Sequence, residues 1–156
     1  MSKEPKGKIC FVIAPIDAEG SHIRIRSDLV LKYIIGPAAK ECGYEPLRAD
    51  HIAEPGIITS HVIQHIVEDP LVIADLTGRN PNVFYELALR HALKKAVVQL
   101  IHVSEPLPFD VAATRTIQFD HCNLESAAKA KEQIVAQIRA VEKNPSDVDS
   151  PIDPCQ

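Results

Sequence analysis

The chain has 156 residues, of which 46% are hydrophobic, and this is enough for one domain of ordinary size but argues against a second. The formal net charge of -4 argues against general nucleic-acid binding, which needs a net basic face. Aromatic residues make up only 4% of the chain and tryptophan is absent, so no stacking platform for single strands is available. Small-molecule partners fit this composition best.

The cysteines and the apolar segments indicate the compartment. The four cysteines are scattered without a CxxC pair, so we expect reduced thiols at Cys10, Cys42, Cys122 and Cys155. No stretch of the sequence approaches the roughly 20 apolar residues of a membrane span. Residues 1–7 also lack the apolar region of a signal peptide. We therefore expect a cytoplasmic protein without a membrane partner.

The spacing of apolar residues predicts strands that alternate with helices. Residues 8–15 form a continuous apolar run, as expected for a parallel strand that is covered on both faces. A helix is predicted over residues 24–42, where Pro37 should kink it and Gly43 should end it. The remaining predicted elements are strand 45–48, helix 57–68, strand 71–76, helix 81–94, strand 96–102, strand 116–120 and helix 123–143.

This alternation implies a parallel sheet with right-handed crossovers. The predicted class is α/β, a single-domain flavodoxin-like or Rossmann-like sheet of about five strands with helices on both faces. The domain is expected to span residues 8–143, after a flexible amino terminus at residues 1–7. Residues 144–156 contain three prolines and three aspartates, so we expect a disordered tail there.

Two carboxylates flank the loop between the strand at 71–76 and the helix at 81–94. Asp75 ends the strand, and Glu86 lies in the second helical turn. Asn80 is a good N-cap for this helix and Pro81 a good first helical residue. Because such loops border the crevice in which open α/β sheets bind ligands, we predict that Asp75 and Glu86 face one ligand site.

A pair of carboxylates suits chemistry at the anomeric carbon of a sugar. An ionised Glu86 could trap or stabilise an oxocarbenium-like centre. Asp75 could accept hydrogen bonds from ribose hydroxyls or, with a raised pKa, donate a proton. A reading without chemistry stays open, in which Glu86 and Arg90 form an i to i+4 ion pair on an exposed helix face and Asp75 only turns the chain.

Other polar residues follow the first two predicted strands. Arg24 and Arg26 could grip a phosphate beside a helix start, or could belong to a solvated basic segment. Arg48 and Asp50 could contact a base or a ribose, or could lie in a surface loop.

Further candidates lie in the helix at 57–68 and near the last strand. Ser60 and His61 could donate to a phosphate, although a capping role is the simpler interpretation. His61 and His65 are one turn apart, but no third ligand accompanies them, so we expect no metal site. Asp110 and Arg115 could belong to a loop that closes over the pocket or meets a second subunit.

The segment ADLTGRNPNVFYELALRHALKKAVV resembles the signature of the nucleoside 2-deoxyribosyltransferase-like superfamily. In that family a strand ending in an acidic residue precedes a helix with a catalytic-glutamate motif, here Tyr85-Glu86-Leu87. FVIAP, GYE before LRAD, EPG and PFDVAATRTIQFD are similar to a bacterial branch of unassigned activity, and the likeness covers about residues 8–139. The superfamily is also similar in architecture to TIR domains, some of which use a Glu to cleave NAD.

The resemblance implies an enzyme that cleaves N-glycosidic bonds without a cofactor. Glu86 matches the family's nucleophile and Asp75 lies beside the same pocket, with Asn80, Asn82 and Tyr85 as neighbouring substrate contacts. The substrate would be a nucleoside, a nucleotide or an NAD-like dinucleotide, and hydrolysis is favoured over transfer. A homo-oligomer is possible, because enzymes of this superfamily often complete their pockets across subunit contacts.

Two other classes of function stay open. The transferases also use an Asp near the start of the helix before the third strand, where this chain has Ser60, His61 and Val62. A nucleotide-binding sensor without turnover is therefore one alternative. A structural interaction domain is the other, and it predicts no nucleotide binding.

Overall fold

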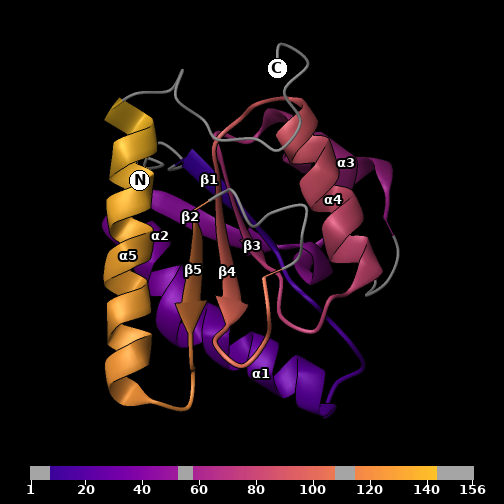
Figure 1. Cartoon of the computed structure of the whole chain (residues 1–156). Helices are drawn as coiled ribbons and strands as arrows, with labels where there is room; N and C mark the ends of the chain where they lie inside the picture. The colour runs from indigo at the N-terminus through magenta and orange to yellow at the C-terminus, as the bar shows by residue number, and fades with distance from the viewer. Residues whose placement is uncertain (1–7, 53–57, 108–114, 144–156) are drawn as a thin grey trace, which may run out of the picture.

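The apolar runs predicted as strands pair side by side in one parallel sheet (Figure 1). The computed structural model describes residues 8–52, 58–107 and 115–143. The strands are β1 Lys8–Ile13, β2 Tyr44–Arg48, β3 Leu71–Asp75, β4 Val97–His102 and β5 Thr116–Phe119. Their order is β2-β1-β3-β4-β5, with parallel pairing throughout. This is the flavodoxin-like order, so the predicted α/β class is confirmed.

Helices cover both faces of the sheet. They are α1 His22–Val30, the π-helical turn η1 Leu31–Ile35, α2 Gly36–Glu41, the 3-10 turn η2 Ala49–His51, α3 Ser60–Glu68, α4 Pro81–Ala92 and α5 Leu124–Lys143. In Figure 1, α2 and α5 lie on one side of the strands, and α3 and α4 lie together on the other. None of the helices in the described ranges combines the length and the apolar character of a membrane-spanning segment.

Alternate residues of β3 enter two separate cores. Leu71 and Ile73 belong to the core shared with α2 and α5. Val72 and Ala74 belong to the core shared with α3 and α4. Because successive side chains of a strand point to opposite faces, a strand covered on both faces must be apolar throughout, and this accounts for the continuous run in the sequence.

The helix predicted over residues 24–42 is interrupted by the π-helical turn η1, which ends two residues before Pro37. Pro37 has no N–H to donate, and the Gly36 N–H before it donates to the Leu31 carbonyl. A Cβ at Gly36 would lie only 2.7 Å from that carbonyl oxygen. The glycine is therefore required by the close approach of two backbone segments.

Several expectations concern residues outside the described ranges. These are the amino terminus at residues 1–7, the tail at residues 144–156, Asp110 and Cys155. The other three cysteines, Cys10, Cys42 and Cys122, carry free thiols.

Candidate functional site at the carboxyl edge of the sheet

Asp75, the last residue of β3, is fully buried at the point where the chain leaves the sheet. Its Oδ1 accepts the N–H of Thr77 at 3.0 Å and the Thr77 hydroxyl at 2.6 Å. The Thr77 hydroxyl oxygen in turn accepts the backbone N–H of His102 at 3.0 Å. The second oxygen of Asp75, Oδ2, is also buried and has no hydrogen-bond partner within the described structure. The loop therefore holds this carboxyl group through Oδ1 and makes no hydrogen bond to Oδ2.

Burial raises the pKa of Asp75 above its ordinary value. The two hydrogen bonds from Thr77 and the positive charge of Arg26 act in the opposite direction. Burial prevails, so Asp75 is easier to protonate than an exposed aspartate.

The start of α4 is as the sequence predicts. Asn80 is the N-cap, and its Oδ1 accepts the N–H groups of Asn82 at 2.8 Å and Val83 at 3.4 Å. Pro81 is the first helical residue. The Asn80 side-chain oxygen therefore serves the helix, and Tyr85, which is 53% exposed, lies on the solvent side of α4.

Glu86 occupies the buried stripe of α4, together with Val83, Leu87 and Arg90. Its side chain is 7% exposed, and burial raises its pKa to about 7. No hydrogen bond or ion pair to this carboxyl group is found among the described residues. The sequence predicts an ionised glutamate near a helix start, whereas burial makes Glu86 about half protonated at neutral pH.

The reading without chemistry joined an exposed Glu86–Arg90 ion pair with an Asp75 that only turns the chain. The ion pair does not form, whereas the two bonds from Thr77 to Asp75 Oδ1 agree with the turn. Arg90 is fully buried and donates to backbone carbonyls. Its Nη1 bonds the Ile66 oxygen at 2.8 Å, and its Nε and Nη2 bond the Ala96 oxygen at 3.1 and 2.9 Å. Arg90 thus ties the end of α3 to the start of β4, and burial lowers its pKa to about 10.

Asp75 and Glu86 lie on opposite faces of the sheet. Asp75 has the same parity as Leu71 and Ile73, so its side chain leaves β3 on the face covered by α1 and α5. Glu86 belongs to α4, whose Val83 and Leu87 pack in the other core. Both carboxyl groups are predicted to face one crevice because one loop joins them. The alternation of β3 separates them, and only a ligand that crosses the end of this strand could contact both.

Arg24, Asp28, Arg48 and Asp50 form a charge network between α1 and the turn after β2. Arg48 Nε and Nη2 bind Asp50 at 2.6 and 3.0 Å, and Arg48 Nη2 also reaches Asp28 at 2.6 Å. Arg24 contacts both carboxylates at 3.2 Å. Burial acts to raise the pKa of Asp50, but the hydrogen bonds from Arg48 outweigh it and the pKa is lowered. Arg24, Arg48 and Asp50, predicted as ligand contacts, thus have partners within the protein.

Ser60 and His61 at the start of α3 are both exposed, and within the described ranges no hydrogen bond of either side chain is found. The cap expected from Ser60 is supplied one residue earlier, where the Thr59 hydroxyl accepts the N–H of Val62 at 3.2 Å. His65 pairs with Asp69 at 2.7 Å.

Arg26 is the predicted site residue that approaches Asp75. It lies on α1, and a Cβ added at Gly78 would be 3.8 Å from its Nη2. Among the residues that the structure describes, the Nε and Nη2 atoms of Arg26 are buried without a hydrogen-bond partner, and so is Nδ1 of His121 in the turn after β5. Burial lowers the pKa of His121, and the positive charges of His102 and Arg26 lower it further. Arg26, Asp75 and His121 are called the carboxyl-edge cluster below.

His102, Asp120 and His121 are residues that sequence reasoning missed. Their ligating atoms lie within 4.8 Å of one another, so this group could hold a metal ion. His102 Nδ1 accepts the Ser104 N–H at 3.1 Å, and its Nε2 lies 3.4 Å from Asp120 Oδ1. A signal was available, because His102 ends one predicted strand and Asp120 ends its neighbour. The helical spacing of His61 and His65 gives no indication of this group, which depends on the pairing of β4 with β5.

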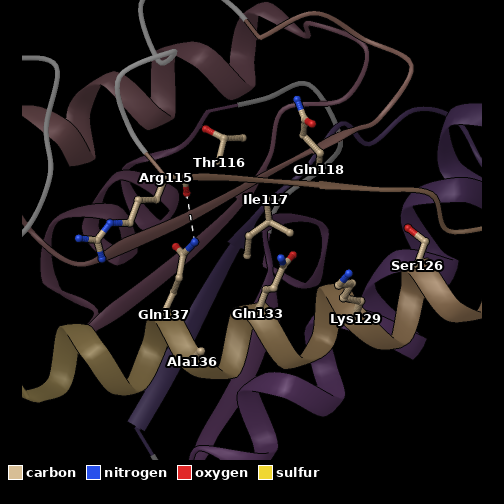
Figure 2. Close-up of a pocket in the computed structure, with 9 residues that line it drawn as sticks. All are labelled: Arg115, Thr116, Ile117, Gln118, Ser126, Lys129, Gln133, Ala136 and Gln137. Carbon is tan, nitrogen blue, oxygen red and sulfur yellow. Dashed lines mark hydrogen bonds between the residues drawn. The ribbon is translucent and has the colours of Figure 1, made fainter.

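Two hollows lie away from the carboxyl-edge cluster. The first, about 540 Å³, lies between β5 and α5. Figure 2 shows Gln137 of α5 reaching across it to the Arg115 carbonyl, a hydrogen bond of 3.2 Å. The second, about 400 Å³, lies at the amino ends of the strands, away from the carboxyl edge, and is lined in part by Lys8, Lys94 and Lys95. Neither hollow is lined by Asp75 or Glu86.

Comparisons with known proteins assign no family. No protein-family model matches the chain, and no curated protein matches it. Among solved structures, the chain is similar to the Francisella novicida lysine decarboxylase LdcF, with 16% sequence identity and a TM-score of 0.49. That match covers 87% of this chain and 17% of the decarboxylase chain.

Proposed function

We propose that the chain binds a nucleoside or nucleotide at the carboxyl edge of the sheet and cleaves its N-glycosidic bond, with Glu86 acting at the anomeric carbon. The observation that carries this proposal is the state of Glu86, a buried carboxyl group without a partner among the described residues. A carboxyl group in apolar surroundings destabilises a fold when it ionises, so its presence on the buried stripe of α4 favours a chemical role. It is also the glutamate of the Tyr85-Glu86-Leu87 motif.

A pKa of about 7 makes both protonation states of Glu86 available at neutral pH. The carboxylate would stabilise or trap the positive anomeric carbon as the C1–N bond breaks and its electron pair leaves with the base. The base takes up a proton, and water supplies the new hydroxyl group at C1. Asp75 Oδ2 would accept a hydrogen bond from a sugar hydroxyl at the other side of β3.

The test is release of free base, followed by chromatography, from nucleosides, nucleoside monophosphates and NAD. Replacing Glu86 by Gln keeps the size of the side chain and removes the carboxylate, so base release should fall by about 10²–10⁴-fold. Glu132 is exposed on α5, and Glu132→Gln is the matched control that should leave the rate unchanged. Base release that persists in Glu86→Gln at the wild-type rate would remove Glu86 from the reaction.

A nucleotide-binding sensor without turnover is the second candidate. The separation of Asp75 and Glu86 onto opposite faces favours it, because a two-carboxylate mechanism needs both groups at one sugar. The absence of an acidic residue at Ser60, His61 and Val62 supports it as well. If calorimetry shows that a nucleotide binds and the nucleotide is then recovered intact, the chain is a sensor.

A further inference from the structure

Four buried polar atoms lack a partner in the described structure, and all of them lie in the carboxyl-edge cluster. They are Nε and Nη2 of Arg26, Oδ2 of Asp75 and Nδ1 of His121. These residues come from α1, the end of β3 and the turn after β5. Buried polar groups in folded proteins are nearly always paired, so the gathering of four unpaired atoms in one place indicates a site for a polar ligand.

Electrostatic coupling supports the proximity of the three residues. Arg26 acts on the pKa of Asp75, and both residues act on the pKa of His121. Nη2 of Arg26 also reaches the loop after β3, since a Cβ at Gly78 would lie 3.8 Å from it. Hydrogen bonds join Asp75 through the Thr77 hydroxyl to the backbone N–H of His102, and the ring of His102 lies 6.0 Å from that of His121. The three side chains therefore lie near the carboxyl ends of the strands, with Asp75 next to the point between β1 and β3 where the strand order reverses. Open α/β sheets bind ligands at this switch point.

Arg26 differs from Arg24 and Arg48 in that no carboxylate of the described residues binds it. Arg24 and Arg48 each bind Asp28 and Asp50. Within the described ranges, no ion pair to Arg26 is found. A guanidinium group with two buried, unpaired N–H positions is expected to take an external anion.

We propose that Arg26, Asp75 and His121 bind the phosphate and one hydroxyl group of a sugar phosphate. Nε and Nη2 of Arg26 lie along one edge of the planar guanidinium group and match two phosphate oxygens, as in other bidentate contacts. His121 Nδ1 donates to a third oxygen in the tautomer that carries its proton on Nδ1. Asp75 Oδ2 is an acceptor and would repel a second anion, so it selects a hydroxyl group. The choice of a pentose phosphate rests on the proposed function.

Calorimetric titration of the full chain with ribose 5-phosphate, inorganic phosphate and ribose separates the two contacts. Ribose 5-phosphate should bind more tightly than either of the others. Arg26→Gln should lower the affinity for ribose 5-phosphate and for inorganic phosphate by at least about tenfold, because hydrogen bonds to charged groups contribute strongly to the binding free energy. Asp75→Asn should reduce the preference for ribose 5-phosphate over inorganic phosphate. Arg139 is exposed near the far end of α5, and Arg139→Gln, which removes the same charge, should change neither affinity.

Three results would overturn the proposal. These are no heat with any of the three ligands, equal weakening by Arg26→Gln and Arg139→Gln, and ribose binding as tight as ribose 5-phosphate binding. If circular dichroism shows that Arg26→Gln does not fold, Arg26→Lys keeps the charge without the bidentate fork and should still weaken ribose 5-phosphate binding. Failure of this binding site can be distinguished from failure of the proposed enzymatic function. Glu86→Gln should bind ribose 5-phosphate as the wild type does, and a chain that binds it but releases no base retains this site and loses the enzymatic proposal.

Discussion

Glu86→Gln should remove a pH-dependent loss of stability. Burial raises the pKa of Glu86 from 4.5 to about 7, so the folded chain favours the protonated form more than the unfolded chain does. The folded state therefore binds the proton across this interval, and the stability of the wild type falls as pH rises from about 4.5 to about 7. Above that pH the loss is complete. A shift of about 2.5 units at about 1.4 kcal/mol per unit gives about 3 kcal/mol.

Urea unfolding of the wild type and Glu86→Gln at several pH values measures this effect. Gln is neutral at every pH, so the difference in unfolding free energy between the two proteins should change by about 3 kcal/mol in favour of Gln on going from about pH 4.5 to about pH 8. Other titrating groups cancel in this difference. The exposed control Glu132→Gln should stay within about 0.5 kcal/mol of the wild type. If the difference in unfolding free energy between the wild type and Glu86→Gln were the same at every pH, the burial of Glu86 would be refuted.

Three further results are expected. Arg90→Met should lower the unfolding free energy by about 3 kcal/mol in urea unfolding, because it removes the Arg90 donor from the Ile66 carbonyl and leaves the Ala96 carbonyl with the Val72 N–H alone; a loss below about 1 kcal/mol would fit a surface ion pair instead. Gly36→Ala should lower it by about 1–3 kcal/mol, because its Cβ would lie 2.7 Å from the Leu31 carbonyl oxygen, whereas a neutral effect, like that expected of Lys40→Ala on the same helix, would contradict the π-helical turn. Base release, followed by chromatography, should rise with pH through about 7, because the ionised form of Glu86 acts on the sugar; a rate that is constant between about pH 6 and about pH 8 would exclude this role.

Local sequence signals were sufficient to predict the fold. The apolar runs, the N-cap at Asn80 and Pro81 at the first helical position place the β3–α4 unit within a residue or two of its observed bounds. Each of these features depends on residues close together in the chain. The cap of α3 shows the limit, since Thr59 and Ser60 are both capable residues and the choice between them depends on where the backbone turns.

The site depends on contacts between distant segments, which the sequence does not reveal. Arg24 and Arg26 are equivalent in the sequence as two arginines of a basic segment. In the structure, Arg24 meets Asp50, which is far away in the chain, while Arg26 turns toward the end of β3. The sequence also does not reveal on which face of the sheet the Asp75 side chain lies, because β3 is apolar on both faces and its pattern does not distinguish them.

A crystal structure of Glu86→Gln with a nucleoside monophosphate tests the central claim most directly, because this variant should bind the nucleotide without cleaving it. The account predicts a nucleotide that crosses the end of β3, with its phosphate against Arg26 and its anomeric carbon beside the side chain at position 86. A nucleotide held on the Arg26 side alone, with its anomeric carbon separated from position 86 by β3, would contradict the enzymatic role of Glu86.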